Sequence, residues 1–165
     1  MNMDNEKITF LDRVLLAKPT HRMAVEWPIL VIVAVLGEMF SWSKIPFSPY
    51  SNILGGIVIV GAWTFHVYCH RAHHKAHEQS SSIDSIVSTG VFARIRHPMY
   101  LSLILMYFGF AIAWGVLWIF LPAFLFSILT VLTAIREEQF LVRKLGSQYE
   151  EYMRQVPWRF IPRVF

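Results

Sequence analysis

Residues 99–135 read MYLSLILMYFGFAIAWGVLWIFLPAFLFSILTVLTAI and contain no charged side chain. Gly115 divides this stretch into two apolar segments, Met99–Trp114 and Val116–Ile135. A helix needs roughly 20 predominantly apolar residues to cross the hydrocarbon core of a bilayer. The sequence therefore predicts two membrane helices joined by a tight turn, so that the chain enters the bilayer and returns to the face from which it came.

Two further apolar segments precede this pair, at Met23–Trp42 and Asn52–Cys69. The first of them carries two acidic residues, Glu26 and Glu38. Of the 165 residues, 55% are hydrophobic and 15% are aromatic, which is more than ordinary soluble domains contain. We therefore expect an all-α integral membrane protein with about four transmembrane helices, of which the last two form a C-terminal helical hairpin.

The chain after Ile135 differs from the membrane segments because apolar residues recur there at helical spacing among charges. This pattern predicts a cytosolic amphipathic helix, which Gly146 interrupts. Pro157 and Pro162 end the helical pattern. We expect the apolar end, Trp158–Phe165, to pack back onto the membrane face or over a site.

The basic residues predict the orientation in the membrane. With the N-terminus in the cytoplasm and four crossings, Lys44 is the only one of the 15 Lys and Arg residues on the outer side. This bias supports a multi-pass protein with both termini in the cytoplasm. Anionic lipid headgroups then account for the net charge of +4, and no nucleic acid partner is predicted. The single cysteine, Cys69, excludes an internal disulfide and a multi-cysteine metal site.

Polar residues stand at both ends of the expected hairpin. Arg96-His97-Pro98-Met99-Tyr100 opens its first helix, and Arg136-Glu137-Glu138 follows its second helix. A hairpin returns both groups to the same face of the bilayer. They can therefore converge there on one small, charged ligand.

Five short motifs follow one another at fitting distances and resemble the isoprenylcysteine carboxyl methyltransferase family of integral membrane methyltransferases. The wider group includes phospholipid N-methyltransferases. The resemblance covers about half of the chain, from roughly Lys75 to the C-terminus. It divides the single membrane domain 1–165 into a cytosolic segment 1–22, two membrane helices within 23–70 and a methyltransferase-like core 71–165. The motifs are Ser88-Thr89-Gly90-Val91-Phe92, Arg96-His97-Pro98-Met99-Tyr100, Glu137-Glu138, Leu145-Gly146-x-x-Tyr149-x-x-Tyr152, and Val156-Pro157 with Ile161-Pro162.

The resemblance implies that S-adenosylmethionine binds on the cytosolic side and that a lipophilic substrate enters sideways from the bilayer. No obligate protein partner is implied. Carried over by position, the acidic pair and its neighbour border the transfer site, at Arg136, Glu137 and Glu138. The cofactor contacts fall on His77, Ser85, Ile86, Val87, Gly90, Phe92, Arg96, His97, Pro98, Met99 and Tyr100.

These residue types suit the cofactor's chemistry on their own account. Arg96 or His97 can pair with its carboxylate through charge-assisted hydrogen bonds. Tyr100 and Phe92 offer aromatic faces, which attract a cation such as a sulfonium. Either carboxylate of the Glu137-Glu138 pair can hold the ammonium group or orient the acceptor. An amine acceptor would in addition need a general base, for which Glu137 is the candidate.

One position departs from the family pattern. Relatives that methylate prenylated cysteine usually place an arginine about one helical turn before the acidic pair, where this chain has Thr133. Arg136 is the nearest guanidinium in the sequence, and it points to another side of the helix. An isoprenylcysteine-type carboxylate, a related amphiphile and a phospholipid amine therefore all stay open as acceptors.

The histidines support a different hypothesis. His66, His70, His73, His74 and His77 recur at helical spacing and resemble the histidine boxes of di-iron membrane oxidases and hydroxylases. Those enzymes use more boxes than the seven histidines of this chain can supply. A small non-catalytic membrane adaptor is a third alternative. Bound cofactor would separate a methyltransferase from both, and stoichiometric iron would identify the oxidase.

Overall fold

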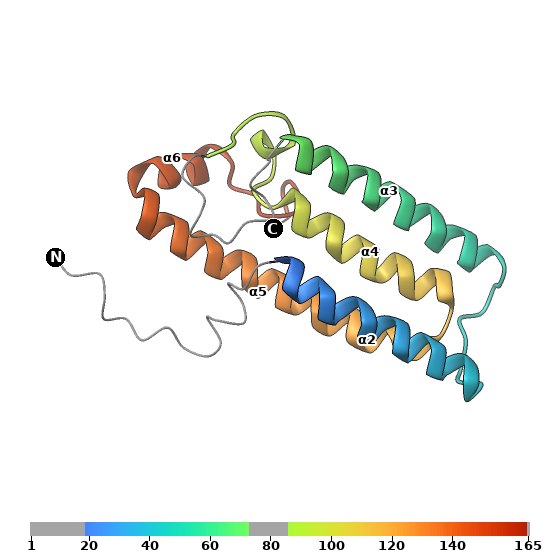
Figure 1. Cartoon of the computed structure of the whole chain (residues 1–165). Coiled ribbons are helices and arrows are strands. Elements are labelled where there is room, and N and C mark those ends of the chain that lie inside the picture. Colours follow the sequence, from blue (N-terminus) through green and yellow to red (C-terminus); the bar gives the residue numbers. More distant parts are fainter. Residues whose placement is uncertain (1–18, 73–85, 165) are drawn as a thin grey trace, which may run out of the picture.

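The computed structural model describes residues 19–72 and 86–164, which are helical apart from short connections. Four long helices run side by side in an elongated bundle, and the short helix α6 lies at one end of it (Figure 1). The described part of the chain contains no strand, only an isolated bridge between Lys44 and Val116. The helices are α2 (Pro19–Met39), α3 (Tyr50–Ala72), α4 (Pro98–Trp114), α5 (Phe120–Leu145) and α6 (Ser147–Gln155).

All four predicted apolar segments are helices, with shifted ends. The largest shift is in α5, which continues through the charged residues 136–144 and ends at Leu145. The predicted tail helix is therefore two pieces, the end of α5 and the separate helix α6. Gly146 stands between them with a φ of 57°, a left-handed backbone conformation that favours glycine.

Among the residues that the structure describes, two helical stretches are long and apolar enough to cross a membrane, α3 and the continuous stretch Leu117–Leu145. At 17 residues, α4 is shorter. Four residues of α3 are buried, and its exposed side chains include the large apolar residues Ile53, Leu54, Ile57, Val60 and Trp63. An apolar helix with an apolar exposed face suits contact with lipid. The structure supports the membrane class, while four crossings and cytoplasmic termini stay predictions.

Close contact between α3 and α4 depends on small residues. A Cβ atom on Gly55 would lie 2.1 Å from the backbone nitrogen of Ala113 and 2.7 Å from the carbonyl oxygen of Gly109. A Cβ atom on Gly109 would in turn lie 3.0 Å from the side chain of Ile59. Helices in membranes commonly associate through such small residues, because these let the backbones approach closely.

A buried polar network joins α2 to the helix pair α4 and α5. Glu26 of α2 is 4% exposed and accepts hydrogen bonds from Arg22 of α2 and from the hydroxyl of Tyr107 in α4. Arg22 also donates to the hydroxyl of Thr133 in α5. Glu26 therefore lies inside the bundle with two partners, which explains how an acidic residue is accommodated in an apolar segment.

The second acidic residue of α2 lies in a different environment. Glu38 is exposed near the end of the helix and pairs with Lys44 at 2.8 Å. Lys44 belongs to the connection that follows α2, where the backbone of Ser43 accepts a hydrogen bond from Leu117. This contact places the α2–α3 connection beside the α4–α5 connection.

Replacing Gly55 with alanine should destabilise the bundle by about 1–3 kcal/mol, because the new methyl group would meet backbone atoms that cannot move away independently. The neighbouring substitution Gly56→Ala is the matched control, since its Cβ atom meets nothing within 4 Å. Thermal unfolding in detergent micelles measures both. Equal unfolding temperatures for the two variants would contradict the proposed α3–α4 contact.

Candidate active site

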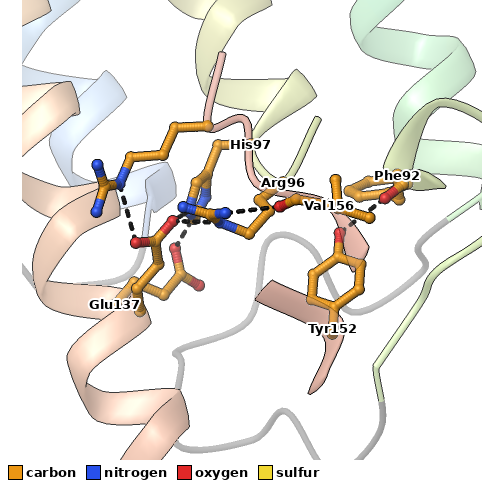
Figure 2. Close-up of polar contacts among 8 residues, drawn as sticks. Phe92, Arg96, His97, Glu137, Tyr152 and Val156 are labelled. Carbon is orange, nitrogen blue, oxygen red and sulfur yellow. Dashed lines mark hydrogen bonds and ion pairs between the residues drawn. The ribbon is translucent and has the colours of Figure 1, made fainter. Parts of the chain in front are cut away.

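Three cationic or hydrogen-bonding side chains converge on the carboxylate of Glu138, which is 3% exposed. Two of them, Arg96 and His97, are labelled in Figure 2. The Arg96 Nε donates to Oε1 at 2.7 Å, and the Arg159 Nε donates to Oε2 at 2.9 Å. The His97 Nε2 lies 3.0 Å from Oε1. A carboxylate only accepts hydrogen bonds, so this nitrogen carries a proton.

The backbone before α4 is held by the end of the chain. The amides of Arg96 and His97 donate to the carbonyls of Trp158 and Arg159, each at 2.9 Å. The Arg96 Nη1 donates to the Val156 carbonyl at 2.6 Å. The C-terminal segment therefore packs over the Arg-His-Pro motif, one of the two placements that the sequence predicted for it.

Pro98 then begins α4 at its first helical position. Proline suits this position because its missing N–H would have no partner within the helix and its φ angle is already helical. The helix start fixes the direction in which the neighbouring side chains project. The ring of His97 stacks on Tyr100 with centroids 5.5 Å apart and an interplanar angle of 19°.

A hollow that is partly open to solvent lies between the motif, α5 and α6. Its lining residues come from four separate parts of the chain: Ile86, Val87, Phe92, Arg96, His97, Pro98, Met99, Tyr100, Glu137, Leu141, Leu145, Tyr149 and Tyr152.

Nine of the residues predicted for the site line this cavity, and the others do not. Gly90 begins a short 3₁₀ turn beside it and has a φ of 61°. Glu138 is buried behind the wall, held by the contacts described above. Arg136 is exposed and donates from Nη1 to Gln139 at 3.2 Å, so the structure does not bring it to the cavity. His77 and Ser85 lie outside the described residues.

Sequence reasoning missed part of the wall and the third partner of Glu138. Leu141 and Leu145 follow Glu137 at intervals of four residues, so the spacing places all three on one face of α5. That spacing was a usable signal. Arg159 offered none, because it lies in a non-helical segment whose path depends on tertiary contacts.

Two buried tyrosines of α6 form the aromatic part of the wall. Burial raises the pKa of Tyr152 to about 12, with Arg96 opposing the shift and Glu138 adding to it. Burial, together with the carboxylates of Glu138 and Glu137, raises the pKa of Tyr149 well above its usual value. Both phenols therefore stay neutral at physiological pH. The Tyr152 hydroxyl donates to the Phe92 carbonyl at 2.8 Å, which ties α6 to the 3₁₀ turn.

The cavity thus combines two chemical environments. One part of the wall is apolar and aromatic and suits a flat ring system. Another part carries the Glu137 carboxylate, whose Oε2 lies 4.0 Å from the His97 Nδ1, together with the guanidinium of Arg96. Such a cavity can bind a molecule with both a flat apolar part and a charged part.

One of the histidines in the proposed boxes, His66, lies in the contact between α3 and α4. His66 is buried in α3, and its Nδ1 lies 2.8 Å from the Ser102 Oγ. Ser102 donates its proton to the Met99 carbonyl, so the Nδ1 of His66 is the donor in the first contact. Within residues 19–72 and 86–164 there is no group of three potential metal ligands. His73, His74 and His77 lie outside these ranges.

A model of the phospholipid methyltransferase family matches residues 50–148, which is more than half of the chain. The chain belongs to the phospholipid methyltransferase family. This family is related to the isoprenylcysteine carboxyl methyltransferases, so the predicted resemblance is confirmed. The matched residues of this phospholipid methyltransferase family member include α3, α4 and α5, and with them the Arg-His-Pro motif and the acidic pair.

The chain is also similar to delta(14)-sterol reductase of Mus musculus, with 32% identity over 83 residues. The similarity covers 48% of this chain but only 20% of the reductase, so the chain corresponds to about a fifth of that protein. The reductase belongs to the same superfamily. The superfamily therefore includes proteins of different activities.

Replacing Glu138 with alanine should destabilise the protein by about 3 kcal/mol or more, because Arg96 and Arg159 would lose their buried counter-charge. The exposed variant Glu151→Ala on α6 should cost little stability, since its ion pair with Arg154 is open to solvent. Chemical unfolding in micelles compares the two. If both variants lose the same stability, Glu138 is not the structural centre of the site.

Proposed function

We propose that this protein catalyses S-adenosylmethionine-dependent methyl transfer to a lipophilic acceptor embedded in the membrane. The observation that supports this most is the cavity, in which aromatic and charged walls meet at the end of an apolar helix bundle. Family membership agrees with it, since the family is one of membrane methyltransferases. The acceptor would be an isoprenylcysteine-type carboxylate, a related amphiphile or a phospholipid amine.

The lining residues fit the proposed cofactor part by part. Phe92, Tyr149 and Tyr152 provide aromatic surface for the adenine ring. Arg96 has donors on Nη2 that no contact among the described residues uses, and these can pair with the carboxylate of the amino-acid moiety. Glu137 can hold the ammonium group. Each charge of the proposed cofactor thus has an oppositely charged or aromatic partner at the cavity wall.

When bound, the cofactor supplies an electrophilic methyl group on a sulfonium. The contribution of the chain is to align the acceptor atom with that group and to keep water away from it. An acceptor carboxylate forms the new C–O bond as the S–CH₃ bond breaks, and no proton has to leave. An amine acceptor must lose a proton as well, which Glu137 can take.

The proposed setting is an integral membrane protein that crosses the bilayer several times, with both termini and the cavity on the cytoplasmic side. The lipid bilayer and the lipophilic acceptor are then its partners. No nucleic acid and no obligate protein partner is needed for the proposed reaction. A cavity at the ends of the helices is open to a water-soluble cofactor, while the apolar helix faces contact the acceptor's chain.

A reductase is the second candidate, because of the similarity to the mouse sterol reductase. Reduction would require a hydride donor in place of a methyl donor. The two hypotheses differ in the cofactor and share the membrane setting. The identity of the bound cofactor therefore separates them.

Protein in lipid vesicles, supplied with methyl-labelled S-adenosylmethionine, should transfer label into the organic-solvent extract. The variant His97→Ala should lose about 100-fold or more of this activity, because the ring that contacts both Tyr100 and the Glu138 carboxylate is removed.

The control is His70→Ala, since His70 of α3 is not among the residues that line the cavity. This variant should keep its activity within about twofold, as expected for a substitution outside the site. Absence of label in every lipid extract, or full activity of His97→Ala, would contradict the proposed function.

A further inference from the structure

The guanidinium of Arg22 lies close to the cavity although the residue is far from it in sequence. Its Nη1 donates to the Thr133 hydroxyl, which also donates to the Leu129 carbonyl at 2.8 Å. Thr133 stands one helical turn before Glu137 on α5, so the two share a face of that helix. Glu137 in turn lines the cavity.

The guanidinium of Arg22 comes from α2 and reaches α5, the helix that carries the acidic pair. Its Nη1 contacts the hydroxyl of Thr133 on α5. No spacing rule could have predicted this, because 111 residues separate the two partners. The first helix of the bundle therefore supplies a cation to the neighbourhood of the acidic pair.

The hydrogen bonds of Arg22 leave part of its guanidinium available. The group has five N–H donors. Nε and Nη2 donate to the Glu26 Oε1 at 3.2 and 2.9 Å, and Nη1 donates to Thr133. Within the part of the chain that the structure describes, one donor on Nη1 and one on Nη2 have no further contact. Two N–H groups are thus available for an oxygen-bearing ligand.

The ion pair joins α2 to the bundle, but stability alone is a weak reason for burying two charges. Both side chains are largely buried, at 13% exposure for Arg22 and 6% for Glu26. Buried ion pairs are often no more stabilising than apolar residues of similar size. Ionisable groups inside membrane helices more commonly mark a functional site. Arg22 stands in the first turns of α2, at the end of the bundle that carries the cavity (Figure 1).

We propose that Arg22 binds an anionic oxygen, of a carboxylate or a phosphate, in the headgroup of the lipophilic acceptor. This inference rests on the proposed function. An amphiphile with its chain in the bilayer carries its headgroup at the membrane surface, near the ends of the helices. Glu26 holds the guanidinium in place and neutralises much of its charge. Arg22 thereby selects acceptors that have an anionic group close to the atom that receives the methyl group.

The test uses two labelled probes, tetradecanoate and tetradecyl phosphate, with protein in a neutral detergent that is saturated with S-adenosylhomocysteine. Wild-type protein should bind at least one probe saturably, and the preferred probe distinguishes a carboxylate from a phosphate headgroup. Arg22→Gln should weaken this binding about tenfold or more, since a charge-assisted hydrogen bond is lost. Arg22→Lys should recover part of it.

The variant Glu26→Gln should change probe binding in the opposite direction from Arg22→Gln. It removes the counter-charge but keeps an oxygen for the Arg22 contact, so anionic probes should bind more tightly than to wild type. A merely structural ion pair predicts weaker or unchanged binding. The exposed Arg94→Gln, at the same end of the bundle, should change nothing.

The outcomes separate this inference from the function on which it rests. Saturable binding of S-adenosylhomocysteine with no binding of either probe overturns the role of Arg22 alone. If a probe binds and Arg22→Gln does not change its affinity, the role of Arg22 is likewise overturned. Absence of S-adenosylhomocysteine binding overturns the proposed function, and the inference with it. If Arg22→Gln fails to fold, the direction of the Glu26→Gln effect decides.

Discussion

The carboxylate of Glu138 is the interaction on which the site depends. It is buried and accepts from Arg96, His97 and Arg159, which come from the start of α4 and from the C-terminal segment. A buried charge is costly unless such partners compensate it. Because these partners come from separate parts of the chain, the Glu138 carboxylate links α5 to the start of α4 and to the C-terminal segment. These links hold the cavity wall in place.

The apolar bundle supports this arrangement at a distance. Gly55 and Gly109 let α3 and α4 approach closely, while Arg22, Glu26 and Tyr107 join α2 to α4 and α5. The helices are thus fixed by two kinds of contact, close backbone packing and buried hydrogen bonds. Both are needed where lipid supplies no hydrophobic driving force between helices. Rigid helices in turn hold Tyr100 and Glu137 at the cavity.

Sequence reasoning could predict what depends on local pattern. Apolar length gave the helices, and the hairpin argument brought the Arg96–Tyr100 motif and Glu137 to one end of the bundle. The continuation of α5 through charged residues was missed, because a change in polarity does not end a helix without a breaker such as Gly146. Arg159 was also missed as a partner of Glu138, and Arg22 as a partner of Thr133. Their contacts join residues far apart in sequence and arise only from tertiary packing.

The central claim is that the cavity binds S-adenosylmethionine or its product, and calorimetric titration of the detergent-purified protein tests it most directly. The same sample is titrated with S-adenosylhomocysteine and, separately, with NADPH, the usual type of hydride donor for a reductase. The account predicts saturable binding of S-adenosylhomocysteine at about one molecule per chain, and no binding of NADPH. Saturable binding of NADPH alone would contradict it and would assign the cavity to a reductase.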